Sequence, residues 1–261
     1  MNKYTVLKKL IDGEETLIIP DAFNPLSAKL IEYTGFKAVQ CSGYSFAMAA
    51  GYESEVDVSL EENLISTRKI VESVDVPVMA DAEDGYGGPE DVSGTVGRFI
   101  DTGVAGLNLE DQIPDGKHTV SVVDEDLMMQ KIIAARETAE IKDVPDFIIN
   151  SRTDALKSTD SREDGLEIAI ERANQYLSAG ADLAFITYVE TLDEVKQIVR
   201  EVKGPVSIAA GLQYNIKNFT LNDLQSCGVA RVSLPTLLVV SSVDAMEKAL
   251  NLIISDELHT I

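Results

Sequence analysis

Acidic side chains end two apolar runs of this 261-residue chain, and their spacing suits a metal ion. The first run ends in Asp81 and Glu83, which would point to the same side if both belonged to one strand. The second run ends in Glu110. Close carboxylates repel unless a cation lies between them, and oxygen ligands of this kind suit Mg²⁺. We therefore predict a magnesium site formed by these three residues, with solvent-exposed acids as the alternative. Asp84 and Asp111 are expected to be such surface acids.

An arginine follows another apolar run and could bind an anionic substrate. The guanidinium of Arg152 can hold a carboxylate through two parallel hydrogen bonds. The alternative is a structural ion pair with Asp154 or Glu110. Arg152 is accordingly predicted to be both a catalytic and a substrate-binding residue.

Two further segments are candidates for handling charge and protons. Successive backbone N–H groups at Ser42, Gly43 and Tyr44 could hold a developing oxyanion, although any glycine-containing turn can look alike. A polar loop carries Lys117 and His118. It could be a mobile lid that delivers an acid or a base, or simply a solvated loop.

Short apolar segments alternate with longer amphipathic ones along the whole chain. Strands are predicted at 16–20, 38–42, 76–80, 106–109, 146–150, 183–187, 205–209 and 230–234. Helices are predicted at 25–34, 60–73, 89–102, 124–142, 162–179, 192–202, 221–226 and 243–254. Eight such units predict a single (β/α)₈ TIM barrel of α/β class spanning residues 1–261, with a doubly wound open sheet as the alternative. In a barrel, the strand ends that carry the residues named above meet at one rim.

The composition limits the partners of the protein. A net charge of −22 argues against binding to nucleic acid or to an anionic membrane surface. A small anionic substrate would need a metal ion or an arginine to bind. We found neither a signal peptide nor an apolar run long enough to cross a membrane, and with two cysteines in the chain we expect a cytoplasmic protein.

Taken together, these segments resemble the isocitrate lyase/phosphoenolpyruvate mutase superfamily. The resemblance rests on segments 41–43, 80–87, 103–112, 131–136 and 151–155, and above all on the D-x-D/E-x-G-Y/F-G and G-x-x-G-x-x-x-E-D patterns. It implies a (β/α)₈ barrel whose last helix is often exchanged between the subunits of a homodimer or homotetramer. It also implies Mg²⁺ or Mn²⁺ bound by the three acids, and an enolate stabilised by the metal, Arg152 and the backbone at 42–44.

The chain departs from the superfamily pattern at several places. The lid has no cysteine and carries Lys117 and His118 instead; Ser54 stands where many members have an aspartate. Thr187, expected to contact the substrate, stands where lyases have glutamate and mutases histidine. We expect a Mg²⁺-dependent lyase, or a related hydrolase or decarboxylase, acting on a small 2-oxo or 2-hydroxy carboxylate. The alternatives are a P–C bond enzyme, such as a phosphonopyruvate hydrolase or phosphonomutase, and a non-catalytic carboxylate-binding protein.

Overall fold

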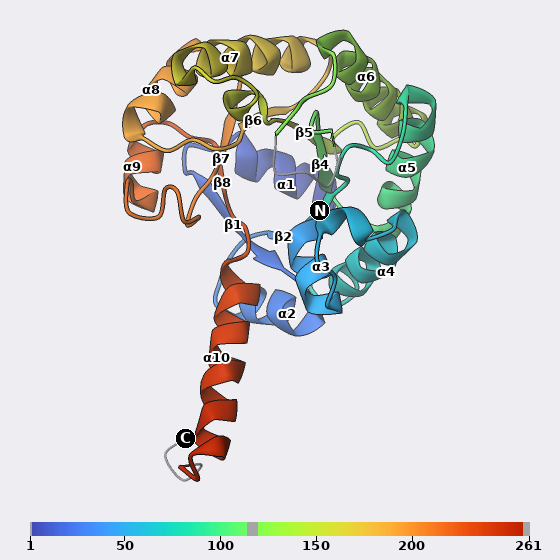
Figure 1. The fold of residues 1–261 in the computed structure, drawn as a ribbon. Helices are drawn as coiled ribbons and strands as arrows, with labels where there is room; N and C mark the ends of the chain where they lie inside the picture. Colours follow the sequence, from blue (N-terminus) through green and yellow to red (C-terminus); the bar gives the residue numbers. More distant parts are fainter. Residues whose placement is uncertain (1, 114–119, 258–261) are drawn as a thin grey trace.

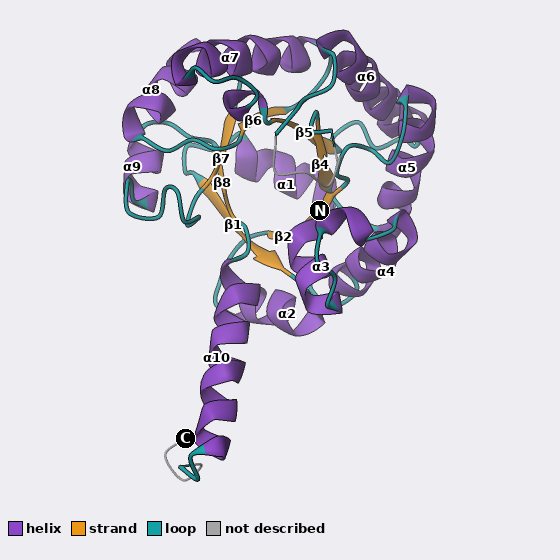
Figure 2. Ribbon diagram, in the orientation of Figure 1, coloured by secondary structure: helices purple, strands orange, loops and turns teal. Residues whose placement is uncertain are grey.

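The computed structural model describes residues 2–113 and 120–257 and confirms the predicted (β/α)₈ barrel. Eight parallel strands pair in chain order, and the last pairs with the first to close the barrel, which lies inside a ring of helices (Figures 1 and 2). The strands are β1 Leu17–Ala22, β2 Val39–Cys41, β3 Val78–Asp81, β4 Gly106–Glu110, β5 Ile148–Thr153, β6 Leu183–Ile186, β7 Val206–Ala209 and β8 Arg231–Leu234.

Most of the helices of the described residues surround this barrel (Figure 2). The α-helices are α1 Lys3–Ile11, α2 Pro25–Tyr33, α3 Gly43–Ala50, α4 Leu60–Val71, α5 Pro89–Thr102, α6 Glu125–Ile141, α7 Arg162–Ser178, α8 Leu192–Glu201, α9 Leu221–Ser226 and α10 Leu237–Ile254. Two short 3₁₀ helices, η1 Glu55–Asp57 and η2 Ala155–Lys157, lie in the loops that follow α3 and β5.

Local sequence signals explain where many of these helices begin and end. Pro25 and Pro89 occupy first helical positions, where a missing N–H costs nothing. Gly103 and Gly180 follow helices with φ of 91° and 112°, a left-handed conformation that a side chain would strain. The predicted helix ends therefore agree with the structure at these positions.

The sequence-based assignment missed α1, α3 and the first turns of α10. Helix α1 lies at the amino-terminal end of the barrel, where the fully buried Leu7 packs with Ile11 among residues of several strands. Thr5 Oγ1 donates a hydrogen bond to Asp146 Oδ2 at 2.6 Å. Helix α1 thus seals the end of the barrel opposite the carboxyl ends of the strands.

The barrel interior contains a buried arginine. Arg231 on β8 is fully buried; it donates from NH1 to Ser207 Oγ at 2.7 Å and also to Gln40 Oε1. Burial lowers the pKa of Arg231 to about 10, against the opposing effect of Asp21. The carboxylate of Asp21, at the strand-end side, is itself buried. These polar contacts join β2, β7 and β8 across the barrel below the carboxyl-terminal rim.

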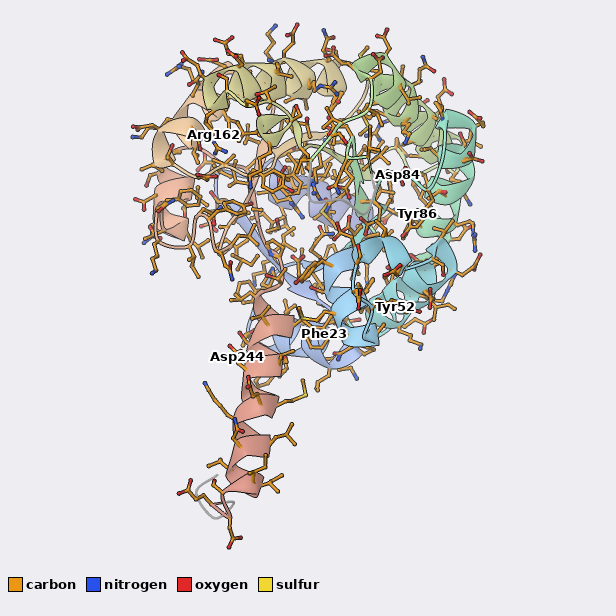
Figure 3. All side chains as sticks on the ribbon, in the orientation of Figure 1. Phe23, Tyr52, Asp84, Tyr86, Arg162 and Asp244 are labelled. Atoms are coloured by element: carbon orange, nitrogen blue, oxygen red, sulfur yellow. The ribbon has the colours of Figure 1, made fainter. Side chains whose placement is uncertain are left out.

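Helix α10 extends away from the barrel (Figures 1 and 3). Apolar side chains are exposed along its length: Met246 is 57% exposed, Leu250 61% and Ile254 84%. Among its described residues Val239 is the buried one. Within residues 2–113 and 120–257, no helix has both the length and the apolar character needed to cross a bilayer. Helix α10 therefore carries an exposed apolar surface.

Candidate active site

Three acids meet at the carboxyl-terminal rim of the barrel. Asp81 ends β3, Glu110 ends β4 and Glu83 lies in the turn after β3; one carboxylate oxygen of each lies within 4.8 Å of the others. Asp81 Oδ1 and Glu83 Oε1 are buried and accept no hydrogen bond from the described residues. Buried carboxylate oxygens without donors are a set that a hard cation such as Mg²⁺ could coordinate. The residues present therefore fit a divalent metal ion.

Glu83 reaches this cluster by a route that the sequence did not reveal. We expected Asp81 and Glu83 to share one strand, but β3 ends at Asp81. Glu83 instead adopts the left-handed region with φ of 51°, which is uncommon for a residue with a side chain. The turn is held by a hydrogen bond from Glu110 N–H to Glu83 O at 2.9 Å and by one from Gly85 N–H to Ala82 O at 2.8 Å. The bend in the backbone, rather than strand alternation, brings the two carboxylates together.

The cluster is electrostatically unfavourable without a cation. Burial, followed by the charges of Asp81 and Glu110, raises the pKa of Glu83 well above its usual value. Burial also raises the pKa of Glu110 well above its usual value, although Arg152 opposes this shift. Burial likewise raises the pKa of Asp81. A divalent ion would offset these charges and favour the ionised forms of all three acids.

The amino terminus of α3 packs directly on the acids. Ser42 is the N-cap of this helix, and the Gly43 N–H donates to Asp81 Oδ2 at 3.1 Å. A Cβ on Gly43 would lie 1.6 Å from Glu83 Oε1, so a side chain there would have to displace the Glu83 carboxylate. Tyr44 is 45% exposed. The predicted backbone site at 42–44 therefore adjoins the acids, and its Gly43 donor is already paired with Asp81.

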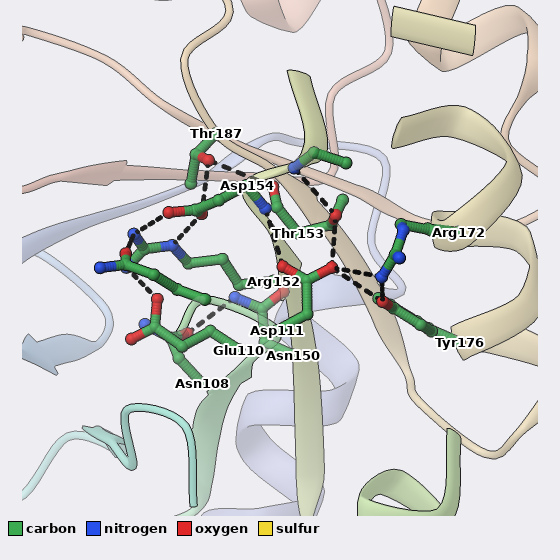
Figure 4. A network of polar contacts seen from close by, with 12 residues as sticks. Asn108, Glu110, Asp111, Asn150, Arg152, Thr153, Asp154, Arg172, Tyr176 and Thr187 are labelled. Carbon is green, nitrogen blue, oxygen red and sulfur yellow. Dashed lines mark hydrogen bonds and ion pairs between the residues drawn. The ribbon is translucent and has the colours of Figure 1, made fainter. Parts of the chain in front are cut away.

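Arg152 connects the acids to the neighbouring strand (Figure 4). It belongs to β5, which extends three residues beyond the predicted boundary, and it pairs in register with Glu110 of β4. Its Nε and NH2 donate to the two carboxylate oxygens of Asp154 at 2.8 and 2.9 Å, and its NH1 lies 2.6 Å from Glu110 Oε2. Both ion pairs that the sequence suggested as an alternative role for Arg152 are present.

Thr187 lies behind this arginine. Its Oγ1 donates to Asp154 Oδ1 at 2.7 Å and to Thr153 O at 3.1 Å, and the side chain is buried. Thr187 therefore hydrogen-bonds to Asp154, the acid that is paired with Arg152. Substrate contact by Thr187, predicted from the sequence, remains a prediction.

Asp111 is a buried structural centre, and its interpretation as a surface acid is wrong. Its carboxylate is fully buried and accepts four hydrogen bonds (Figure 4). The donors are Thr153 Oγ1 at 2.7 Å, the Asp154 N–H at 3.0 Å, Tyr176 OH at 2.8 Å and Arg172 NH1 at 3.2 Å. Asp111 thus links α7 to the end of β5 and positions the backbone of the residue that clamps the arginine.

A cavity of about 180 Å³ opens beside the acids. Its walls are formed by the turn after β3, the end of β4 and the segment around η1. The lining residues are Glu55, Val56, Val58, Glu83, Asp84, Tyr86, Glu110 and Gln112. Our sequence analysis did not select Glu55 as a site residue. The available signal was its place beside Ser54, one of the departures from the superfamily pattern noted above. That the side chain of Glu55 faces the cavity could not be read from the sequence.

The remaining predicted site residues, Lys117 and His118, lie outside the described residues. Asp84, predicted to be a surface acid, lines the cavity and lies 3.6 Å from Lys131 Nζ in an ion pair. Lys131 also donates to the backbone oxygen of Asp84 at 2.7 Å. This lysine of α6 therefore anchors the glycine-rich turn, a contact that the sequence analysis did not foresee.

Comparison with known proteins agrees with this geometry. The family model described as phosphoenolpyruvate phosphomutase matches residues 7–254. The chain is 35% identical to 2,3-dimethylmalate lyase of Eubacterium barkeri over 78% of this chain and 70% of that protein. It is 31% identical to 2-methylisocitrate lyase of Aeropyrum pernix over 94% of this chain and 78% of that protein. A solved structure of oxaloacetate acetylhydrolase in complex with the product oxalate superimposes with a TM-score of 0.88 at 26% identity, covering 97% of this chain and 86% of that chain.

Proposed function

The chain belongs to the phosphoenolpyruvate phosphomutase family, within the isocitrate lyase/phosphoenolpyruvate mutase superfamily of enzymes, and from this premise we propose a specific reaction class. The protein is a Mg²⁺-dependent lyase, with Mn²⁺ as a substitute, that breaks a C–C bond of a small 2-oxo or 2-hydroxy carboxylate through an enolate. The observation that carries the proposal is the cluster of three acids beside an arginine, in which Asp81 and Glu83 have buried oxygens that accept no hydrogen bond from the described residues.

Asp81, Glu83 and Glu110 would hold the metal ion. When bound, the ion would supply Lewis-acid stabilisation of the negative charge that develops on substrate oxygens. The small size of the cavity favours a small acid over a bulky ligand, since pockets for drug-sized molecules are larger. Val56 and Val58 give one wall an apolar surface that could accommodate a methyl group.

Arg152 would orient the carboxylate of the substrate. Its Nε and NH2 are occupied by Asp154, so its position is set before the substrate binds. NH1 is paired with Glu110, and its second N–H would donate to the substrate. The start of α3 at 42–44 contributes the positive end of a helix dipole beside the developing charge. Lys117 or His118 would transfer the proton.

The family relationship also supports a second reaction class. The matching family model carries the name of a phosphomutase, so a P–C bond enzyme acting on phosphonopyruvate is the alternative. Phosphate release or isomerisation from phosphonopyruvate would favour that alternative. A non-catalytic carboxylate-binding protein would bind oxalate with Mg²⁺ but would not exchange the methyl protons of pyruvate with deuterated water.

A single substitution tests the metal site. Asp81→Ala should abolish Mg²⁺-dependent cleavage, assayed by NMR over a panel of 2-oxo and 2-hydroxy acids and phosphonates. It should also remove the stabilisation by Mg²⁺ and oxalate in thermal unfolding. Asp101→Ala is the control, because Asp101 is an exposed acid on α5 that pairs with Lys142. Full activity in the Asp81→Ala variant would refute the proposal.

We also propose that α10 pairs with a second copy of the chain, in a homodimer or a dimer of dimers. The exposed stripe on α10 includes Val243, Met246, Leu250 and Ile253, at spacings of three and four residues that share one helix face. Helix α2, beside the base of α10 in Figure 1, exposes a second apolar stripe that includes Leu30. Leu250→Asp should shift the mass measured by sedimentation towards a monomer. An unchanged assembly would exclude this interface.

A further inference from the structure

Glu55 places a fourth carboxylate in the wall of the active-site cavity. It begins the η1 turn, whose N-cap Ser54 accepts a hydrogen bond from the Val56 N–H at 3.4 Å. Its side chain lines the same cavity as Glu83 and Glu110, yet it is not among the acids whose oxygens cluster within 4.8 Å. Glu55 thus faces the space for the substrate, apart from the candidate metal ligands.

The charges around the cavity explain why this carboxylate matters. Asp81, Glu83, Glu110 and Asp154 are acids of the site, and Arg152 is the cation that pairs with two of them. One divalent ion and one arginine would together balance three of these four carboxylates. Among the described residues, Glu55 adds a further negative charge to a group of acids that these two cations do not fully balance. Burial raises the pKa of Glu55, Arg152 opposes this shift, and Asp81 and Asp154 add to it.

A carboxylate in this position discriminates between substituents of the substrate. At a pH above its pKa, the carboxylate of Glu55 is ionised and is purely a hydrogen-bond acceptor, so it favours a hydroxyl group that donates to it. It disfavours a phosphonate, which carries more negative charge than a carboxylate and offers no donor when fully ionised. The neighbouring Val56 and Val58 cannot provide donors for phosphonate oxygens from their side chains.

We propose that Glu55 is the specificity-determining residue of this cavity, selecting carboxylate substrates that bear a hydroxyl group and rejecting phosphonates. The inference rests on the proposed function and deepens it, because a carboxylate at position 55 favours the C–C bond reaction over the P–C bond reaction.

The test compares two ligands that differ by one group. Oxalate has two carboxylates, whereas phosphonoformate has one carboxylate and one phosphonate. Their affinities for the full chain with Mg²⁺ are measured by titration calorimetry at mildly alkaline pH, where the phosphonate is doubly ionised. The unsubstituted protein should prefer oxalate. Glu55→Gln should shift the ratio of affinities towards phosphonoformate by at least about tenfold, the size expected when one charge that faces the ligand is removed from a partly screened site.

Matched variants separate this role from a general effect on charge or folding. Glu53→Gln makes the same chemical change at an exposed position two residues away and should leave the ratio unchanged. Glu55→Asp keeps the charge and should keep the preference for oxalate. Far-ultraviolet circular dichroism and thermal unfolding report whether each variant is folded.

The possible outcomes have different meanings. If oxalate binds and the Glu55→Gln ratio equals that of the unsubstituted protein, the role of Glu55 is overturned while the proposed function stands. If the unsubstituted protein prefers phosphonoformate, the role of Glu55 is overturned and the P–C bond reaction is favoured. If oxalate does not bind with Mg²⁺, both proposals fail.

Discussion

Glu83 and Glu110 should respond in opposite directions to the same isosteric substitution when no metal ion is bound. Glu83 Oε1 is buried without a hydrogen-bond donor and faces two other carboxylates. Glu110 Oε2 instead lies 2.6 Å from Arg152 NH1. Glu83→Gln removes the repulsion between carboxylates and adds an N–H group that can donate a hydrogen bond to Asp81 or Glu110. Glu110→Gln removes the partner of a guanidinium. The first variant should therefore be more stable than the unsubstituted protein, and the second less stable.

The geometry sets the size of each effect. Two charged carboxylate oxygens that lie within 4.8 Å of each other repel by at least about 3.5 kcal/mol at an effective dielectric constant near 20. Proton uptake by the acids relieves much of this repulsion, so we expect Glu83→Gln to raise the free energy of unfolding by about 1–2 kcal/mol. Glu110→Gln should lower the free energy of unfolding by about 1–3 kcal/mol, because Arg152 loses one of its two charged partners. The loss stays within this range because Arg152 keeps its ion pair with Asp154.

Urea unfolding in the presence of EDTA and then of Mg²⁺ measures both quantities. Each substitution removes one predicted metal ligand, so the stabilisation by Mg²⁺ should be largely lost in both variants. A destabilised Glu83→Gln protein in EDTA would show that Glu83 has a favourable partner and would refute the electrostatic argument. Equal Mg²⁺ stabilisation in all three proteins would refute the metal site.

Three further predictions concern pH, close packing and the buried network. Because burial and the neighbouring carboxylates hold the folded-state pKa of Glu83 above its usual value of 4.5, the metal-free protein should lose stability as the pH rises from about 4.5 towards that pKa. Mg²⁺ should suppress this loss, as urea unfolding across pH would show. Gly43→Ala should displace the Glu83 carboxylate and weaken Mg²⁺ binding in calorimetry by about tenfold or more, whereas Gly94→Ala, which has open space around it, should not; equal affinities would count against the close approach. Asp111→Asn should cost about 3–5 kcal/mol in urea unfolding, because four donors share that buried carboxylate; a loss below about 1 kcal/mol would be inconsistent with the network.

The architecture could be predicted because its signals are local. All eight strands lie within a few residues of the predicted ranges, since parallel barrel strands are apolar on both faces and glycine or proline marks many of the boundaries. The errors occur where tertiary contacts decide. Strand β5 continues to Thr153 because its polar end pairs with β4 and β6, and polar residues at the end of a run look like a loop in the sequence. Helix α3 begins at Gly43, a residue that usually ends helices, at a point where a Cβ would lie 1.6 Å from Glu83 Oε1.

The sequence alone determined the order of the strands and helices, the rim where polar groups meet and the three acids that could hold a metal ion. Periodicity and residue type are enough for these features, because each depends on a few neighbouring positions. Only the tertiary structure decided that Glu83 turns inward through a left-handed backbone, that Arg152 is paired on two sides, that Asp111 is buried and that Glu55 faces the cavity. These features depend on contacts between residues far apart in the chain, and the direction of a side chain in a loop is set by what packs against it.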